Sequence, residues 1–290
     1  MPIPVLRSVH VHPVKALRGF TLPEAEVEPW GLAGDRRWAL VDDSGTVVTQ
    51  RRHARLALAS AELLPDGGIT LSAPGREPLT VTVPAPALAS VPAAGPGTEG
   101  QEDDTLPLDI FGTVIDTVPA APEADAWFSA YLGTEVRLVH LDDPARRRPI
   151  DPRYAAPGET VSFADGYPLL ATTTASLDAL NSLIAQGDHA DEGPLPMNRF
   201  RPSVVVDGTA PWAEDDWRRL AIGDVVFRVA KPCGRCVVTT TDQRSGERGK
   251  EPLRTLARHR KSGSSLVFGQ NLIPEHRGTI RVGDPVKILD

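Results

Sequence analysis

The chain has 290 residues, a formal net charge of −7 at pH 7 and two cysteines. The length predicts two domains, the acidic balance argues against a general nucleic-acid binder, and so few cysteines exclude a disulfide scaffold. The first twenty residues hold several basic side chains without an apolar core, so no signal peptide is predicted. No stretch approaches the roughly eighteen apolar residues of a membrane helix. We therefore expect a cytoplasmic protein with no membrane or nucleic-acid partner.

Short β-like runs, separated by turns rich in Gly, Pro and Asp, dominate the chain. In chain order the predicted strands include Val5–His12, Trp38–Asp42, Thr46–Thr49, Leu79–Val83, Val136–Leu141 and Ser203–Val206. Turn signals such as Asp66-Gly67-Gly68 lie between them. Many short strands with frequent turns predict a barrel or sandwich of antiparallel strands.

Helical patterns are fewer and are found in three segments. Pro122–Leu132 has acidic residues in its first turn and is followed by Gly133. Thr174–Ala185 places leucines at helical spacing, with Thr174 as the expected cap. Glu251–Arg260 has a proline in its first turn and ends basic. The chain is thus predicted to be mainly β with a few helices, an α+β protein.

Two irregular segments interrupt these patterns. Pro84–Asp104 is rich in Pro, Ala and Gly and then acidic, and we predict a mobile loop there because a strand pattern resumes after it. Asp142–Gly158 contains Arg146-Arg147-Arg148 and is predicted as a solvated loop, with contact to an anionic ligand as the alternative. We place the domain boundary after the first segment, dividing the chain into residues 1–120 and 121–290.

The strongest chemical signal is a CxxC motif in the segment Lys231–Asp242, KPCGRCVVTTTD. Asp224–Ala230 leads into it as one β run and Val237–Thr241 leads out as another. A thioredoxin-type pair needs a helix N-terminus after the motif, and tetrahedral zinc needs four ligands, so both are disfavoured. We favour one thiolate ligating a metal that a cofactor otherwise holds, with Lys231 and Arg235 stabilising the thiolate. Two ordinary buried cysteines are the alternative.

At this point the chain resembles a known family, the MOSC proteins, particularly the mitochondrial amidoxime-reducing components and their bacterial relatives. The matching fragments, in order, are Val11–Lys15, Gly31–Leu40, Ala175–Asn181, Arg199–Val206, Leu220–Asp224, the CxxC segment, Phe268–Asn271 and Gly278–Val286. They cover nearly the whole chain. The resemblance implies an N-terminal β-barrel-like domain followed by a C-terminal MOSC β-barrel domain.

The resemblance also implies roles for individual residues. Cys236 would be the catalytic cysteine whose sulfur ligates molybdenum, and Cys233 a neighbour whose default role is packing. The residues implied to bind the cofactor are Lys15, Arg36, Thr173, Thr174, Arg201, Gly234, Arg235 and Asn271. A pterin phosphate is a dianion, and the planar donor fork of arginine fits it. Without the family, each of these basic residues would more often be a solvated surface charge.

Two positions depart from the family pattern. Ala16 stands where relatives often carry a serine that could bond the cofactor. Asn271 replaces an aromatic residue of the mitochondrial proteins, which puts the substrate range in doubt more than cofactor binding.

The resemblance implies a molybdenum-dependent oxidoreductase, with a molybdenum–molybdopterin cofactor, that reduces amidoximes, hydroxylamines and N-hydroxylated bases. The chain has neither a four-cysteine iron–sulfur pattern nor a dinucleotide-binding GxGxxG after a strand. We therefore expect a separate electron donor of the ferredoxin or flavin-reductase type. The alternatives are a cofactor carrier or persulfide-handling protein that reduces no substrate, and a structural β protein in which the CxxC is incidental.

Overall fold

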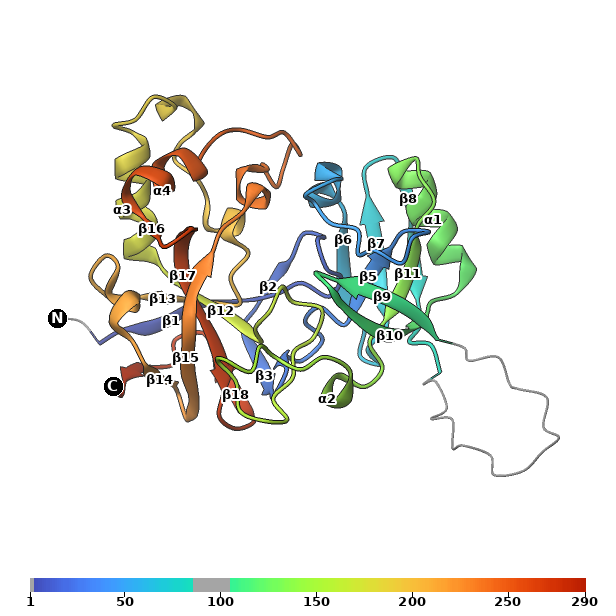
Figure 1. Ribbon diagram of the computed structural model, residues 1–290, viewed down its shortest axis with the longest axis horizontal. Coiled ribbons are helices and arrows are strands. Elements are labelled where there is room, and N and C mark those ends of the chain that lie inside the picture. Colours follow the sequence, from blue (N-terminus) through green and yellow to red (C-terminus); the bar gives the residue numbers. More distant parts are fainter. Residues whose placement is uncertain (1–2, 86–104) are drawn as a thin grey trace.

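The computed structural model describes residues 3–85 and 105–290, apart from the side chains of residues 146 and 147. From residue 86 on, the predicted loop Pro84–Asp104 lies outside the described residues. Two lobes stand side by side in Figure 1, one built on a large sheet and one on smaller sheets with a helix at the edge. The prediction of a mainly β, α+β fold is confirmed.

A large sheet forms the first lobe. Its strands, in spatial order, are β19 (Val286–Ile288), β14 (Arg219–Ile222), β15 (Val225–Gly234), β17 (Ser265–Pro274), β12 (Leu169–Thr173), β13 (Val204–Asp207), β1 (Val5–Val11) and β2 (Phe20–Leu22), with β16 (Lys261–Ser262) paired to β17. Strands β12 and β13 run parallel, and the other neighbours are antiparallel. The N-terminal strand β1 thus completes a sheet whose other members, apart from β2, come from the second half of the chain.

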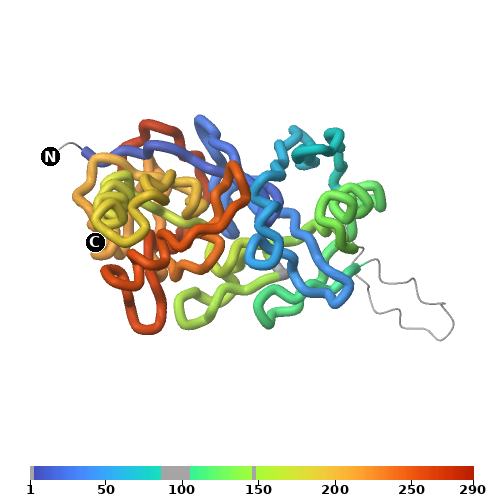
Figure 2. Tube along the Cα trace, turned by 90° about the horizontal axis from the view of Figure 1, so that it is seen from above, coloured from blue at the N-terminus to red at the C-terminus, as the bar shows by residue number. Residues whose placement is uncertain are grey.

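Three smaller sheets complete the molecule. They are β5 (Trp38–Val41), β11 (Arg137–His140), β10 (Thr113–Pro119) and β9 (Leu106–Ile110); β18 (Gly278–Arg281), β3 (Glu24–Glu28) and β4 (Gly31–Leu32); and β6 (Ser60–Leu63), β7 (Ile69–Ala73) and β8 (Arg76–Val81). Strand β3 pairs with the late strand β18, and β11 pairs with the early strand β5. The chain therefore passes between the lobes more than once (Figure 2), and the division at residue 120 stays a prediction.

The three predicted helices are present. They are α1 (Pro122–Leu132), α3 (Thr174–Ile184) and α4 (Leu253–His259), and the described chain adds α2 (Pro144–Arg147) and the 3₁₀ turns η1 (Ala54–Leu58), η2 (Ala190–Glu192), η3 (Met197–Phe200), η4 (Ala213–Asp216) and η5 (Val237–Thr240). Helix α1 ends where Gly133 adopts a φ of 71°. The cap of α3 is Thr173 and not Thr174, because the Thr173 hydroxyl accepts the backbone N–H of Ser176. None of the helices in residues 3–85 and 105–290 combines the length and apolar character needed to span a bilayer.

Two predicted strands are wrong. Thr46–Thr49 makes only isolated bridges, from Val47 to Val41 and from Thr46 to Asp109. The run after the cysteines forms the 3₁₀ turn η5, in which the Thr239 hydroxyl donates to the Cys236 carbonyl and Thr240 does the same to Val237. Threonine hydroxyls that bond nearby carbonyls offer the backbone an alternative to a strand ladder, and β propensity alone does not show this.

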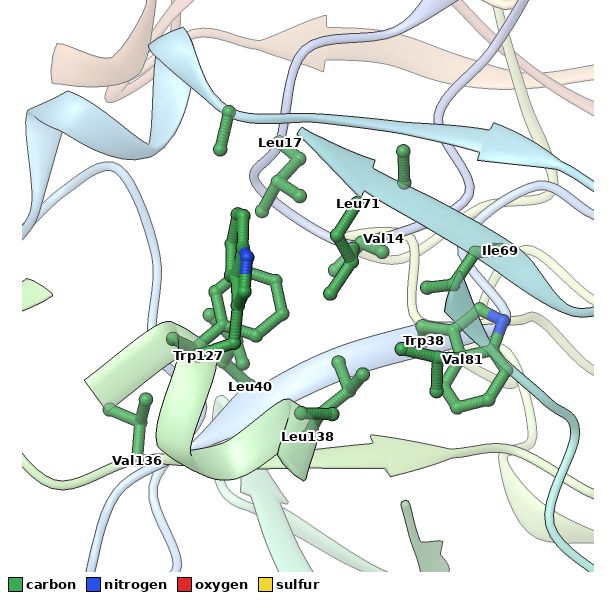
Figure 3. Close-up of a cluster of buried hydrophobic side chains, with 14 of the residues drawn as sticks. Val14, Leu17, Trp38, Leu40, Ile69, Leu71, Val81, Trp127, Val136 and Leu138 are labelled. Atoms are coloured by element: carbon green, nitrogen blue, oxygen red, sulfur yellow. The ribbon is translucent and has the colours of Figure 1, made fainter. Parts of the chain in front are cut away.

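The core of the smaller lobe includes Trp38, which is fully buried (Figure 3). Leu71 and Leu138 pack in the same cluster, together with Val14 and Leu17. Burying each such side chain contributes about 1.5–3 kcal/mol. Because Val14 and Leu17 flank residues 15 and 16, this core fixes the backbone that carries them to the space between the lobes.

Prediction of stability. Gly269 in β17 has a φ of +78°, and a Cβ there would lie 2.6 Å from the carbonyl oxygen of Ala171. Gly283 has a φ of +94° with open space at its Cβ position. We predict that Gly269→Ala lowers the free energy of unfolding by about 2–4 kcal/mol through strain plus overlap, whereas Gly283→Ala costs about 1–2 kcal/mol through strain alone. Denaturant unfolding measures both, and equal losses in the two variants would contradict the prediction.

Candidate functional site

A pocket lies where loops of the two lobes meet. The small-lobe side contributes Lys15, Ala16, Arg36 and the segment 49–51, and the large-lobe side contributes Arg201, the segment 233–236 and Asn271. Seven of the predicted site residues line this pocket: Lys15, Arg36, Arg201, Gly234, Arg235, Cys236 and Asn271. The structure thus brings together residues that lie more than 200 positions apart in the sequence.

The structure does not bring Thr173 and Thr174 to this pocket. Thr173 is fully buried, and its hydroxyl interacts with Ser176 and, at 3.2 Å, with the carboxyl group of Glu214. The Thr174 hydroxyl donates to the Asp207 carboxylate at 2.5 Å. Both side chains therefore serve the start of α3, and their binding of a cofactor stays a prediction.

Lys15 is the most deeply placed cation of the pocket. It is 4% exposed, and its Nζ donates to the Phe163 carbonyl at 2.8 Å and to the Asp165 carboxylate at 2.5 Å. Burial lowers the pKa of Lys15 to about 8, although Asp165 favours the charged form. The other Asp165 oxygen accepts from Arg51 at 3.2 Å. This single carboxylate is therefore shared between two cations.

Two arginines lie next to this pair. Arg36 forms an ion pair with the buried Asp35, and its other terminal nitrogen donates to the Arg201 carbonyl at 3.4 Å. Arg201 donates to the Leu17 carbonyl at 2.6 Å. Burial, with Arg36 close by, lowers the pKa of Arg201 to about 9, so its guanidinium stays charged at neutral pH. Like charges held this close favour an anion between them.

Three pocket residues adopt left-handed backbone conformations. Ala16, Arg36 and Arg201 have φ values of 70°, 50° and 52°. Each such conformation costs about 1–3 kcal/mol in a residue other than glycine, and such residues cluster at functional sites. The pocket is therefore a place where the fold holds strained backbone in position.

The CxxC segment crosses one wall of the pocket as β15 ends. The Arg235 guanidinium contacts Cys233 Sγ at 2.9 Å and donates to the Phe200 carbonyl at 2.6 Å. In the described part of the chain, Cys236 forms no disulfide and is half-buried, and Arg235 Nε is buried without a partner. Arg235 thus contacts the sulfur of Cys233, and the sulfur of Cys236 is the one available to a ligand.

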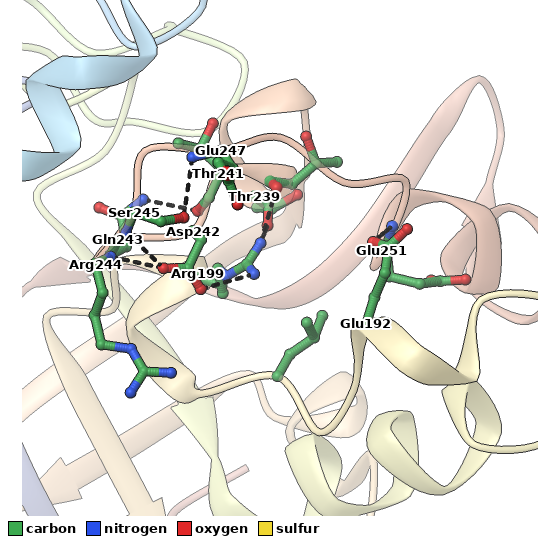
Figure 4. A network of polar contacts seen from close by, with 12 residues as sticks. Glu192, Arg199, Thr239, Thr241, Asp242, Gln243, Arg244, Ser245, Glu247 and Glu251 are labelled. Atoms are coloured by element: carbon green, nitrogen blue, oxygen red, sulfur yellow. Dashed lines mark hydrogen bonds and ion pairs between the residues drawn. The ribbon is translucent and has the colours of Figure 1, made fainter.

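Arg199 fixes the backbone after Cys236 (Figure 4). Its guanidinium is buried and donates to the Thr240 carbonyl at 2.8 Å, with Thr239 at 3.4 Å and the Asp242 carboxylate at 3.2 Å. Charge-assisted bonds of this kind are stronger than neutral ones. This role was not predicted from the sequence, although Arg199 begins the same fragment as Arg201.

Arg148 corrects another prediction. The segment Asp142–Gly158 was expected to be a solvated loop, yet Arg148 is 6% exposed. It donates to the carbonyls of Ser162, Ala164 and Asp165. Arg148 therefore shapes the turn that presents Asp165 to Lys15, and no sequence signal separated it from the two arginines before it.

The two departures from the family pattern also lie in the pocket. The Ala16 carbonyl accepts from the Gln50 side-chain amide at 2.5 Å, so this position contributes through its backbone. The Asn271 side-chain nitrogen donates to the Lys231 carbonyl at 3.3 Å and to the Pro232 carbonyl at 3.5 Å, so this position contacts the backbone of the CxxC segment.

The donor set fits a dianion joined to a soft metal. Five cations line the pocket, namely Lys15, Arg36, Arg51, Arg201 and Arg235, and in the described chain the carboxylates bonded to them are Asp35 and Asp165. Positive charge is thus in excess, and guanidinium groups are suited to phosphate. A cysteine sulfur is a ligand that soft metals prefer.

Comparison with known proteins agrees with this arrangement. The model of the MOSC N-terminal beta barrel domain matches residues 3–135, and the model of the MOSC domain matches residues 158–287. Mitochondrial amidoxime-reducing component 1 of Xenopus laevis is 32% identical over 97% of this chain and 81% of its own length, and the Homo sapiens protein is 32% identical over 96% and 81%. A molybdenum cofactor sulfurase of Oryza sativa subsp. japonica is 28% identical over 91% of this chain and 32% of its own length.

These relatives correct one prediction. The expected cytoplasmic location is contradicted, because the proteins that match nearly the whole chain carry names that place them in mitochondria. The recognition of the family from the residues is confirmed by two domain models and by relatives above 30% identity. The chain belongs to the family of MOSC-domain proteins that includes the mitochondrial amidoxime-reducing components.

Proposed function

We propose that this protein is a molybdenum-cofactor-dependent oxidoreductase that reduces N-hydroxylated compounds with electrons from a separate donor protein. The observation that supports the proposal is the pocket, whose lining combines Cys236 with the buried Lys15 and the half-buried Arg36, Arg201 and Arg235. The names of the relatives, amidoxime-reducing components, support this chemistry.

Different residues of this chain would bind the phosphate and the metal of the cofactor. Lys15, Arg36 and Arg201 would bind the phosphate through charge-assisted hydrogen bonds, and Arg235 has an unused donor for the same anion. Cys236 would supply a thiolate ligand to molybdenum. When bound, the cofactor supplies the two-electron chemistry, while the protein supplies binding, orientation and electrostatics.

Reduction of an amidoxime requires two electrons and two protons. An amidoxime takes up two electrons and two protons, its N–O bond breaks, and an amidine and water are released. Excess positive charge in the pocket favours uptake of electrons and attracts the anionic phosphate. The electrons must come from another protein, because the sequence has no iron–sulfur or dinucleotide pattern.

A second candidate is a sulfur-handling protein that carries a persulfide on Cys236 and reduces no substrate. The likeness to a molybdenum cofactor sulfurase favours it, although the chain spans about a third of that protein. Turnover of an N-hydroxylated substrate by the purified protein separates the two candidates.

Prediction of activity and electron supply. Protein purified from a host that makes the cofactor should contain molybdenum and pterin and should reduce benzamidoxime with dithionite-reduced viologen. It should not oxidise NADH with benzamidoxime unless a ferredoxin or flavin-reductase fraction is added, because the chain has no group to accept a hydride. Substrate consumption and NADH absorbance measure the two parts. Full metal loading without turnover would reject the reductase in favour of the sulfur-handling candidate.

Prediction of the metal ligand. Cys236→Ala should abolish benzamidoxime reduction and change the absorption spectrum of the bound metal, because it removes the available sulfur. Cys233→Ala is the matched control, since its sulfur is engaged by Arg235, and it should keep a substantial share of both signals. An inactive Cys233 variant beside an active Cys236 variant would reverse the assignment.

Prediction of pH dependence. Lys15 is protonated below its pKa of about 8 and neutral above it, so the pocket loses a positive charge as the pH rises through this value. Sulfate stays a dianion throughout, and because about a tenth of the free protein is still protonated at Lys15 at pH 9, we predict that cofactor-free protein binds sulfate up to about tenfold more weakly at pH 9 than at pH 6.5. Lys15→Met should bind weakly and keep only the roughly twofold decrease expected from Arg201, whose pKa is about 9. Titration calorimetry checks both, and a flat wild-type profile would remove Lys15 from the anion site.

A further inference from the structure

A second pocket adjoins the first and has no role in the chemistry described so far. The segment 165–167 lines both pockets, so they meet along it. The second pocket has a volume of about 770 Å³, which lies within the range of roughly 300–1,000 Å³ for small-molecule sites. Its lining combines apolar residues, such as Ile110, Ile150 and Val161, with charged ones, among them Asp151 and Lys231.

Phe111 lies at the edge of this pocket in an unusual backbone position. Thr113 pairs directly with Ile110, so Phe111 and Gly112 form a two-residue hairpin turn between β9 and β10. Their φ values are 58° and 86°, and a turn with two positive φ values strongly prefers Asn or Asp followed by Gly. A bulky residue in this conformation is a genuine outlier. Such strain is retained where a side chain has a function.

The Phe111 ring links the two pockets physically. The ammonium group of Lys15 lies 5.3 Å from the ring centroid, and the guanidinium carbon of Arg51 lies 4.6 Å from it. These cation–π contacts hold the ring at the charged pocket. Yet 52% of the Phe111 side chain is exposed, and the residue also lines the second pocket. The ring therefore offers free aromatic surface at the second pocket.

Building on the proposed function, we propose that the second pocket binds the planar aromatic body of an N-hydroxylated substrate, with Phe111 as its stacking surface. The substrate class is aryl and heteroaryl N-hydroxy compounds, whose N–OH group then faces the first pocket. Offset or edge-to-face ring contacts add about threefold to tenfold in affinity beyond burial of area. A small aliphatic hydroxylamine has no ring and gains nothing from this surface.

Tyr167 supports this arrangement where the pockets meet. Its side chain lines both of them. Burial, followed by the nearby Asp151, raises the pKa of Tyr167 to about 12, so the phenol stays protonated and can donate a hydrogen bond. A donor at the junction matches the oxygen or ring nitrogen acceptors of such a substrate.

The test uses the cofactor-loaded protein and three variants on the same hairpin. Phe111→Asn removes the ring and installs the residue that this turn prefers, so the hairpin should gain stability and misfolding cannot explain a loss. Phe111→Tyr restores an aromatic ring. Val114→Asn is the control, since Val114 is 66% exposed on β10 and does not line either pocket.

Two measurements are made on each protein: kcat/KM for benzamidoxime and for hydroxylamine with reduced viologen, and calorimetric binding of benzamidoxime without an electron donor. We expect Phe111→Asn to lower kcat/KM for benzamidoxime about tenfold more than for hydroxylamine and to weaken benzamidoxime binding about tenfold. Phe111→Tyr and Val114→Asn should keep the wild-type ratio and affinity.

The outcomes separate this inference from the proposed function. Equal effects of Phe111→Asn on the two substrates would overturn the aromatic site and leave the reductase intact. Phe111-dependent binding of benzamidoxime without reduction would reject the reductase and support the aromatic site. Loss of pterin from the Phe111→Asn protein would assign the ring to the cofactor pocket and overturn the inference.

Discussion

The buried ammonium group of Lys15 is the interaction on which the site depends, because it joins loops that lie about 150 residues apart. Its partners are the Phe163 carbonyl and the Asp165 carboxylate. A charge removed from water is tolerated only when its hydrogen bonds are made. The turn that makes them is in turn shaped by Arg148, which binds its carbonyls. A second buried cation thus positions the anion that neutralises the first.

Much of the fold could be predicted from local patterns, because its determinants are local. Pro122 and Gly133 bracket α1 within one stretch of sequence, and the structure keeps both bounds. The strand predicted after the cysteines is wrong, and forms η5 instead, because its conformation also depends on a distant segment. Val-Val-Thr-Thr has high β propensity, but Thr239 and Thr240 bond carbonyls three residues back and Arg199 binds carbonyls from a distant segment. Propensity does not contain that tertiary contact.

The same distinction between local patterns and long-range contacts applies to the candidate site. Cysteines and arginines with a family pattern could be found in the sequence, and seven of the predicted residues do line one pocket. The roles of Arg148 and Phe111 could not be predicted from the sequence. Arg148 belongs to a run of arginines that is typical of a solvated loop, although it is buried. Phe111 occupies a turn position with a positive φ, where phenylalanine is unfavourable. Their importance lies in long-range partners, Asp165 and Lys15 respectively. Only the folded arrangement shows that Arg148 is buried.

The site also has a thermodynamic consequence. Ala16, Arg36 and Arg201 hold left-handed backbone, and burial lowers the pKa of Arg201 beside Arg36, so strain and repulsion both oppose the folded state. The cores on either side, such as that around Trp38 and Val14, offset these costs. A dianion that binds the folded protein and not the unfolded chain adds stability as its concentration exceeds its dissociation constant. Because the anion relieves the same repulsion that destabilises the empty pocket, cofactor affinity and the stability of the loaded protein have one physical origin.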